Sequence, residues 1–331
     1  MDWLGAITIS AGTVMFLLGL EFGGVTFPWS SPKVICLLVF GVLTMGIFML
    51  IQWKLSPRPI VPLQMFTNRN NICAILVCVC HSLCYMAGMY YIPLYYQAGL
   101  GYTPIFSGVL FLIVAVPSTI ALMAGGIYVS KTGKYTLMMR LGFPMLVLAH
   151  GLFINFTPYR SYPRIALFSI IWSCGISTLF QGPLIALQAN LDPKDMGMGT
   201  ATFAFIRQLS AGVSIVIGQV IFQSGMHGKL NTLLAAGVDS SLAETLAEGN
   251  AITATFLVNK LDEAQKLVVR TAVVDALDKM WIFYAAVAGV GFLVCWGIQR
   301  KELSGKYVEY KTGLKDNEKV VAEAEKEKEV V

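Results

Sequence analysis

Two long apolar runs joined by a short polar turn are the feature that most restricts how this chain can fold. The first run, Ile105 to Val129, has no acidic or basic side chain, and the second, Tyr135 to Phe156, has only Arg140 and His150. At a rise of about 1.5 Å per residue, each run is long enough to cross a bilayer as a helix. We therefore expect a helical hairpin that crosses the membrane twice.

The turn of this hairpin, Ser130-Lys-Thr-Gly-Lys-Tyr, sets the orientation of the chain. Lys131 and Lys134 place it in the cytoplasm, because basic residues in short loops are retained on that side. Counting apolar runs outward from the turn gives about eight membrane-spanning helices with both termini inside. The runs are Leu4–Gly24, Val34–Trp53, Ile72–Tyr96, Ile105–Val129, Tyr135–Phe156, Ile165–Ala189, Met198–Phe222 and Trp281–Ile298.

Composition supports the same class. The 331 residues are 56% hydrophobic and 13% charged, whereas about 25% of the residues in an average soluble domain are charged. The expected fold is an all-α membrane protein that lies in a lipid bilayer. We assign the net charge of +5 to loops on one side of the membrane and not to a nucleic-acid surface, since no basic stripe interleaved with aromatic residues occurs.

Polar segments divide the chain into four regions. Residues 1–53 form two helices, 54–71 a cytoplasmic linker rich in proline and basic residues, 72–299 a bundle of six helices, and 300–331 a charged, largely disordered cytoplasmic tail. The bundle region includes an outer segment, 223–280, that is too polar to enter lipid. Within it, residues 261–279 have apolar side chains at helical spacing and predict a helix that lies on the membrane surface.

Signatures of an enzyme are missing. The sequence has no G-x-S-x-G, P-loop or H-E-x-x-H motif, and no pair of intramembrane acids. We expect no cofactor and no metal, since Cys80, His81 and Cys84 lack the paired C-x-x-C spacing of a metal site. The spans hold amides, tyrosines and Arg207 instead, which suits a water-filled cavity through which a solute passes.

Arg207 is the most informative of these residues. It lies about ten residues into its span, where a central arginine costs about 2.5–3.5 kcal/mol on insertion scales. Such a side chain needs an internal partner or a wet cavity. The alternative is a shifted register in which the guanidinium reaches the inner membrane surface.

Three glutamines are further candidates for contact with a solute. Gln181 and Gln188 are seven residues apart and predict one face of a helix, and Gln208 follows Arg207 directly. Amides at such positions either contact a substrate or join one helix to another.

Aromatic and imidazole side chains complete the set. Tyr91 and Tyr95 lie on either side of Pro93, and they either stack on a flat apolar solute or belong to an interfacial aromatic belt. His81 is a candidate proton relay, with a buried packing residue as the alternative.

The cytoplasmic turn also carries a family resemblance. GGIYVSKTGKYTLMM resembles the loop motif G-x-x-x-D-R-x-G-R of the major facilitator superfamily, with matches at Gly126, Lys131, Gly133 and Lys134. Gly133 permits a tight turn, and the lysines can meet acids or helix ends nearby. Ser130 stands where the family has an acid, which removes one charge from that network.

Longer stretches resemble one branch of this superfamily, the fungal fourteen-span drug:proton antiporters. They are DWLGAITISAGTVMFLLGLEFGG with TFPWSS, YYIPLYYQ, GISTLFQGPLIALQ and FAFIRQLSAGVSIVIGQVIF. The resemblance implies that the first two spans are the family's extra central pair and that the others form its carboxy-terminal six-helix bundle. Spans three, four, six and seven would then line the solute cavity, which places Tyr91, Tyr95, Gln181, Gln188 and Gln208 as candidate contacts.

The function implied is that of the carboxy-terminal part of a proton-coupled exporter of drugs, toxins or secondary metabolites. Its solutes would be small amphipathic or aromatic molecules, and its location the plasma membrane, with the vacuolar membrane as the alternative. The family's amino-terminal six spans have no counterpart in the sequence, although alternating access requires two bundles. We therefore expect an amino-terminal half-transporter or a second copy as partner. The alternative interpretation is a half-bundle that transports nothing and associates with another membrane protein.

Overall fold

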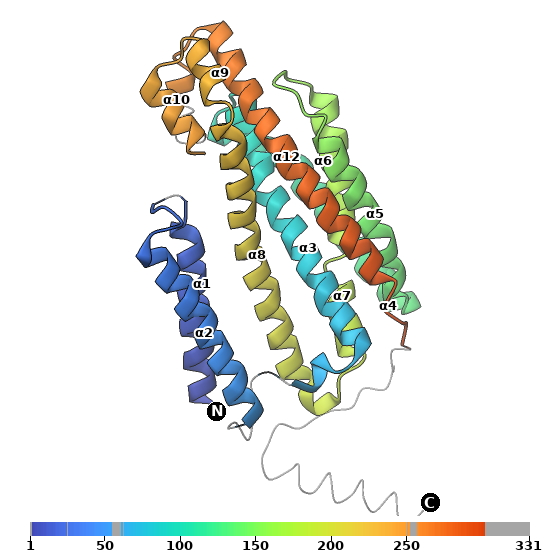
Figure 1. Cartoon of the computed structure of the whole chain (residues 1–331). Coiled ribbons are helices and arrows are strands. Elements are labelled where there is room, and N and C mark those ends of the chain that lie inside the picture. The colour runs from blue at the N-terminus through green and yellow to red at the C-terminus, as the bar shows by residue number, and fades with distance from the viewer. Residues whose placement is uncertain are drawn as a thin grey trace, which may run out of the picture. The chain divides into compact units, whose positions relative to one another are not determined.

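Most of the residues described by the structure lie in helices. The computed structural model describes residues 2–24, 26–54, 61, 63–249, 251 and 257–301. Within them, eight helical segments are long and apolar enough to cross a membrane, which confirms the expected all-α membrane fold (Figure 1). The segments are α1 (Trp3–Phe22), α2 (Pro32–Lys54), α3 (Arg69–Leu94) with the π-helical turn η2 (Tyr95–Gly99), α4 (Pro104–Thr132), α5 (Tyr135–Phe153), α6 (Tyr162–Thr178) with α7 (Gly182–Gln188), α8 (Met196–His227) and α12 (Glu263–Cys295).

Helix α3 lies at the centre of the bundle. It packs against α7, α8 and α12, while α12 also contacts α5, and α5 contacts α6. Helix α4 leans on α6 and leaves large apolar side chains exposed, among them Ile105, Val116 and Ile120. Because lipid tails are as apolar as a protein core, such a helix can be hydrophobic on every side. The central helix α3 is therefore enclosed by other helices, and the peripheral helix α4 has a face suited to lipid.

Hydrogen bonds between elements show which helix termini lie at the same end of the bundle. At one end, Gln299 N donates to Asn70 Oδ1 over 3.1 Å, and Lys301 N donates to Tyr135 Oη over 3.0 Å. At the other, Tyr95 Oη donates to Thr157 O over 2.9 Å. The turn between α4 and α5 thus lies at the same end as the start of α3 and the end of α12, as eight alternating crossings require.

The turn itself has the geometry that the loop motif predicts. Gly133 closes α4 in the left-handed conformation, with φ of 63°, and its N–H donates to Val129 O over 2.7 Å. Glycine adopts this conformation without a steric penalty. Lys131 and Lys134 are both exposed beside it. Gly126 lies two turns back in α4, where the nearest atom to an added Cβ is Oε1 of Gln181, 3.7 Å away.

The sixth span is broken, and the expectation of one continuous helix from Ile165 to Ala189 is wrong. Helix α6 ends at Thr178, and α7 begins at Gly182, with Pro183 in its first turn. Proline has no N–H to donate and restricts the residue before it, so the helix is interrupted just ahead of Pro183. Gln181 therefore lies at the break, ahead of the helix that carries Gln188.

The helix predicted over residues 261–279 is present and leads into the last span, but the prediction that it lies on the membrane surface is wrong. Helix α12 runs without interruption from Glu263 to Cys295, because no glycine or proline breaks its first half and Asp262 caps its start. Its buried residues in that half include Val269, Val273 and Leu277, and it packs against η2 and α9 (Leu230–Ala235). The first half of α12, α9 and α10 (Ser240–Ala247) together form a helical cap at the end of the bundle opposite the α4–α5 turn (Figure 1).

Two expected regions fall wholly or partly outside the described residues. The tail beyond Lys301 is one, and residues 55–60 and 62 of the linker are the other. The described part of the linker contains a 3₁₀ turn, Leu63–Phe66, and α3 begins at Arg69, earlier than the expected Ile72.

Glycines hold the pair α1–α2 together at close range. Gly5, Gly12 and Gly19 are buried and seven residues apart, so they lie on one face of α1. Opposite them, a Cβ added at Gly41 of α2 would lie 2.8 Å from the backbone N of Phe16. Small residues let two membrane helices approach until their backbones nearly touch.

We expect Gly41→Leu to destabilise the α1–α2 pair by about 1–3 kcal/mol, because the added side chain meets backbone atoms that cannot move aside. The measurement is unfolding of the detergent-solubilised chain in SDS, followed by circular dichroism. Gly46→Leu on the same helix is the control, since a Cβ there meets no atom within 4 Å. Equal effects of the two substitutions would contradict the close crossing at Gly41.

Single cysteines on either side of α5 test the crossing pattern and its orientation. In a background without the seven native cysteines, Tyr159→Cys should react with an impermeant maleimide added outside cells, and Thr132→Cys should react only after permeabilisation. Tyr159 is 63% exposed and Thr132 is exposed, so neither is shielded by protein. Labelling of both from outside would reject the eight-span arrangement.

Candidate functional site

Arg207 joins α8 to the break between α6 and α7. Its Nη2 donates a hydrogen bond to the carbonyl oxygen of Phe180 over 2.7 Å. The guanidinium carbon lies 4.5 Å from the ring centroid of Phe180 and 5.0 Å from that of Phe203. The cation is thus held by one backbone carbonyl and two aromatic rings, and both kinds of contact stabilise a guanidinium away from water.

The local sequence explains why these groups meet. Carbonyls at a helix end lack intrahelical partners, and the interruption ahead of Pro183 places Phe180 at such an end. Phe203 precedes Arg207 by four residues on α8, so the two side chains lie on one helical face. The sequence expectations omitted both phenylalanines. Two signals in the sequence could have identified them. The glycine–proline pair after Gln181 predicts a helix break next to Phe180, and the four-residue spacing places Phe203 on the same face of α8 as Arg207.

An aromatic cluster surrounds the cation. His81, Tyr85 and Phe180 have ring centroids between 5.9 and 6.2 Å apart. His81 is 1% exposed, and its Nε2 lies 3.0 Å from Ile176 O. A ring nitrogen next to a carbonyl must be the donor, which leaves Nδ1 as a bare acceptor without a partner among the described residues. Protonation would set a second cation beside Arg207, so the proton-relay role of His81 stays a prediction that this surrounding does not favour.

The three glutamines have different surroundings. Gln188 Nε2 donates to Thr200 Oγ1 over 3.0 Å and so links α7 to α8. Gln181 and Gln208 are exposed, on the sequence positions next to Phe180 and Arg207. Gln188 thus has the helix-joining contact, and the role of Gln181 and Gln208 as solute contacts stays a prediction.

The two predicted tyrosines are packed into the bundle. Tyr91 is 0% exposed, and its hydroxyl donates to Ile215 O over 2.7 Å, which ties α3 to α8. Tyr95 donates to Thr157 O and stacks on Phe156 with ring centroids 4.2 Å apart. Their role as solute contacts stays a prediction, and the observed contacts are those of packing residues.

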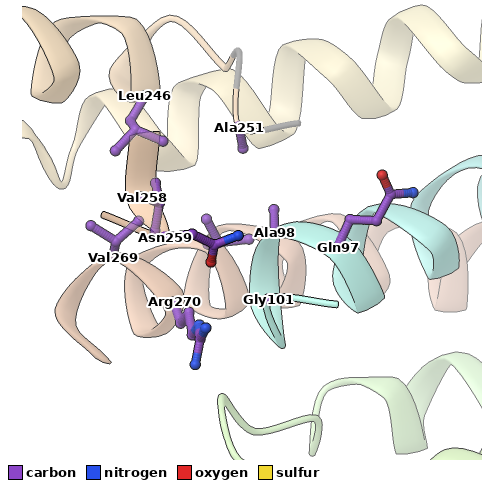
Figure 2. Close-up of a pocket in the computed structure, with 10 residues that line it drawn as sticks. Gln97, Ala98, Gly101, Leu246, Ala251, Val258, Asn259, Val269 and Arg270 are labelled. Carbon is purple, nitrogen blue, oxygen red and sulfur yellow. The ribbon is translucent and has the colours of Figure 1, made fainter. Parts of the chain in front are cut away.

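Two hollows lie at the opposite end of the bundle from the α4–α5 turn. Figure 2 shows the smaller one, lined by Gln97, Ala98, Gly101, Leu246, Ala251, Val258, Asn259, Val269, Arg270 and Val273. Its volume of about 10 Å³ has room for no more than one water molecule. The larger, about 590 Å³, opens between the α1–α2 loop and the ends of α8 and α10, with Trp29, Gln223, His227 and Glu248 in its lining. Only the larger has the size of a small-molecule site, and the sequence expectations did not include it.

Metal-binding groups do not gather in the described part of the chain. No three side chains among its histidines, cysteines, aspartates and glutamates lie close enough to hold an ion. The chemistry available near Arg207 is therefore that of a fixed cation, aromatic faces and amides.

Known proteins of similar sequence are fungal transporters. A family model described as "Fungal trichothecene efflux pump (TRI12)" matches residues 1–100. The "Efflux pump dotC" of Dothistroma septosporum is 39% identical over 96% of this chain and 54% of its own length. The "MFS-type transporter ppz2" of Metarhizium majus is 37% identical over 95% of this chain and 54% of its own. An "MFS-type transporter" of Aspergillus terreus is 36% identical over 99% and 60%.

The fold and the site define a polytopic helical membrane protein with a cation held inside its bundle. The chain is similar in sequence to fungal proteins named efflux pumps and MFS-type transporters, and this similarity confirms the resemblance expected from the loop motif and the later spans. It spans about half the length of the curated relatives it matches. That extent is consistent with the predicted carboxy-terminal portion.

We expect Tyr91→Phe to lower the free energy of unfolding by about 0.5–1.5 kcal/mol and to leave solute binding unchanged, because it removes only the bond to Ile215 O. Unfolding in SDS and binding of an aromatic probe are the two measurements. The matched control is Tyr90→Phe, at a neighbouring ring that is 41% exposed. A loss of binding with unchanged stability would instead make Tyr91 a solute contact.

Proposed function

We propose that this chain supplies one helical bundle of a proton-coupled exporter of small amphipathic or aromatic solutes. The observation that carries the proposal is Arg207, twelve residues into the 32-residue helix α8 and in contact with a carbonyl at a helix break. An ionised side chain at that depth is costly unless it has a function or a partner inside the protein. Discontinuous helices near the membrane centre are a recurring way for transporters to present polar groups to a solute.

The similar fungal proteins support this choice. Relatives are named efflux pumps or transporters, and the similarity to them extends over nearly all of this chain. Arg207, Gln181 and Gln208 are the solute contacts that we propose at the break, with Tyr85 and Phe180 as aromatic faces. The membrane in which the exporter acts is, in this proposal, the plasma membrane.

One bundle cannot alternate access by itself. In transporters of this kind, a solute site lies between two helical repeats that rock against each other. The described residues of this chain supply a pair, α1–α2, and one bundle of six spans. We propose that an amino-terminal half-transporter, or a second copy, supplies the opposing face. A half-bundle that transports nothing is the rival, and the transporter relatives do not favour it.

Uphill export is the test of this function. We expect proteoliposomes with the purified chain alone to show no gradient-dependent accumulation of pyrene derivatives. Proteoliposomes that also contain the amino-terminal six-span half of a relative should accumulate at least one of them when a proton gradient is imposed. Fluorescence of the trapped probe is the measurement, and a dissipated gradient is the control.

Each result bears on the proposal. Accumulation by the chain alone would contradict the need for a separate half and would point to a pathway built by two copies. Failure of the combined halves, with both shown to be folded and bound to each other, would favour the non-transporting rival. Arg207→Ala should abolish export by the combined halves without reducing the amount of chain in the membrane.

A further inference from the structure

The guanidinium of Arg207 has donors that the protein leaves unused. A guanidinium carries five N–H groups. One on Nη2 donates to Phe180 O, and the guanidinium is also within hydrogen-bond reach of the Cys78 thiol, so at most two of the five are used. Its Nε is buried and has no hydrogen-bond partner among the described residues. A planar cation with free donors is the group that recognises a carboxylate or a similar anion in two-point contact.

The carboxylates nearest to the two ends of α8 lie far from this cation. Asp195 precedes α8, so it is about 18 Å from Arg207 along the helix axis. Asp275 is paired with Lys229 just beyond the other end of α8, about 33 Å along the same axis. Glu21 is in the last turn of α1, outside the bundle. Arg207 makes no ion pair with any residue that the structure describes.

The surroundings of the cation are aromatic. Phe180 and Phe203 stack on the guanidinium, and Tyr85 packs against Phe180 and extends the same surface. Tyr85, Phe180 and Arg207 are each partly exposed, so the surface is open to an incoming molecule. Flat rings fit against such faces by offset or edge-to-face stacking, with centroids about 4.5–7 Å apart.

We propose that the solute taken at Arg207 is an aromatic molecule with an ionised acidic group, and that this group serves as the counter-ion of the guanidinium. The proposal rests on the proposed function, because it names the class of solute for the same site. The acidic group accepts hydrogen bonds from Arg207 while the ring system lies against Tyr85 and Phe180. A cationic drug would meet like charge at this point, which disfavours it.

Binding of three matched probes tests the charge preference. The full chain is placed in lipid nanodiscs at pH 7 with 1-pyrenebutyrate, 1-pyrenebutanol or 1-pyrenebutylammonium, and binding to empty nanodiscs is subtracted. We expect the carboxylate to bind about tenfold or more tightly than the alcohol, and the ammonium to bind more weakly than either. Binding of the alcohol also shows whether each variant is folded.

Variants assign the preference to one side chain. Arg207→Gln should make the carboxylate and the alcohol bind equally, and Arg207→Lys should retain part of the preference, because it keeps the charge without the planar fork. Arg140→Gln is the matched control. Arg140 is also an arginine of a membrane helix that stacks on a ring, 4.5 Å from Trp296, but it lies near the inner end of α5. It should leave the preference unchanged.

The outcomes separate this proposal from the function itself. Equal binding of all three probes, a preference for the ammonium, or a carboxylate preference that survives in Arg207→Gln would overturn the acidic-solute proposal. A carboxylate preference without any export by the combined halves would uphold the solute class and reject the exporter function. Export of the alcohol and the carboxylate at the same rate would uphold the exporter function and reject the acidic solute class.

Discussion

Backbone hydrogen bonding in a solvent that offers none is the constraint on which this structure depends. In lipid, each N–H and C=O must find its partner inside the protein, so spanning segments are helical along their whole length. The sixth span departs from that rule between Thr178 and Gly182. The departure is tolerated because Leu179 N and Phe180 N still donate to Ile176 O and Ser177 O, and because Arg207 donates to Phe180 O. A helix break and a membrane arginine, each unfavourable alone, thus stabilise one another.

The polar residues of the bundle fall into two groups. Tyr91, Gln188 and Ser214 bond to groups on neighbouring helices, and each contact fixes one helix against the next. Gln181 and Gln208 lie beside the break and remain exposed. In a membrane bundle, hydrogen bonds between helices each contribute about 0.6–2 kcal/mol, so the first group holds a rigid frame around the second.

The two ends of the bundle differ in structure and in charge. At the end with the α4–α5 turn, short connections and exposed lysines give a compact, basic rim. At the other, α12 extends beyond the apolar part of its span and packs with α9 and α10 into a cap. The cap borders the 590 Å³ hollow and has an ion pair between Lys229 and Asp275. Its charged residues and its small helices suit an aqueous surface, where water can satisfy loops that lipid cannot.

The sequence by itself determined the class, the number of spans and the alternation of their ends. Apolar length is a local property, and so is the need for a left-handed glycine at 133, which is why these two expectations were confirmed. The cytoplasmic side that the lysines of the turn predict stays a prediction. The glycines at 5, 12, 19 and 41 were visible as well, but only their meeting across two helices gave them a meaning. The continuous α12 was missed because a polar first half resembles a surface helix unless α9 and η2 are known to cover it. Tertiary structure alone decided which partners Arg207 finds, since Phe180 is 27 residues away in the chain and reaches the cation only through the break in the sixth span. The sequence can indicate that a buried charge needs a partner. Which group becomes that partner depends on which residues the packed bundle brings close to the charge.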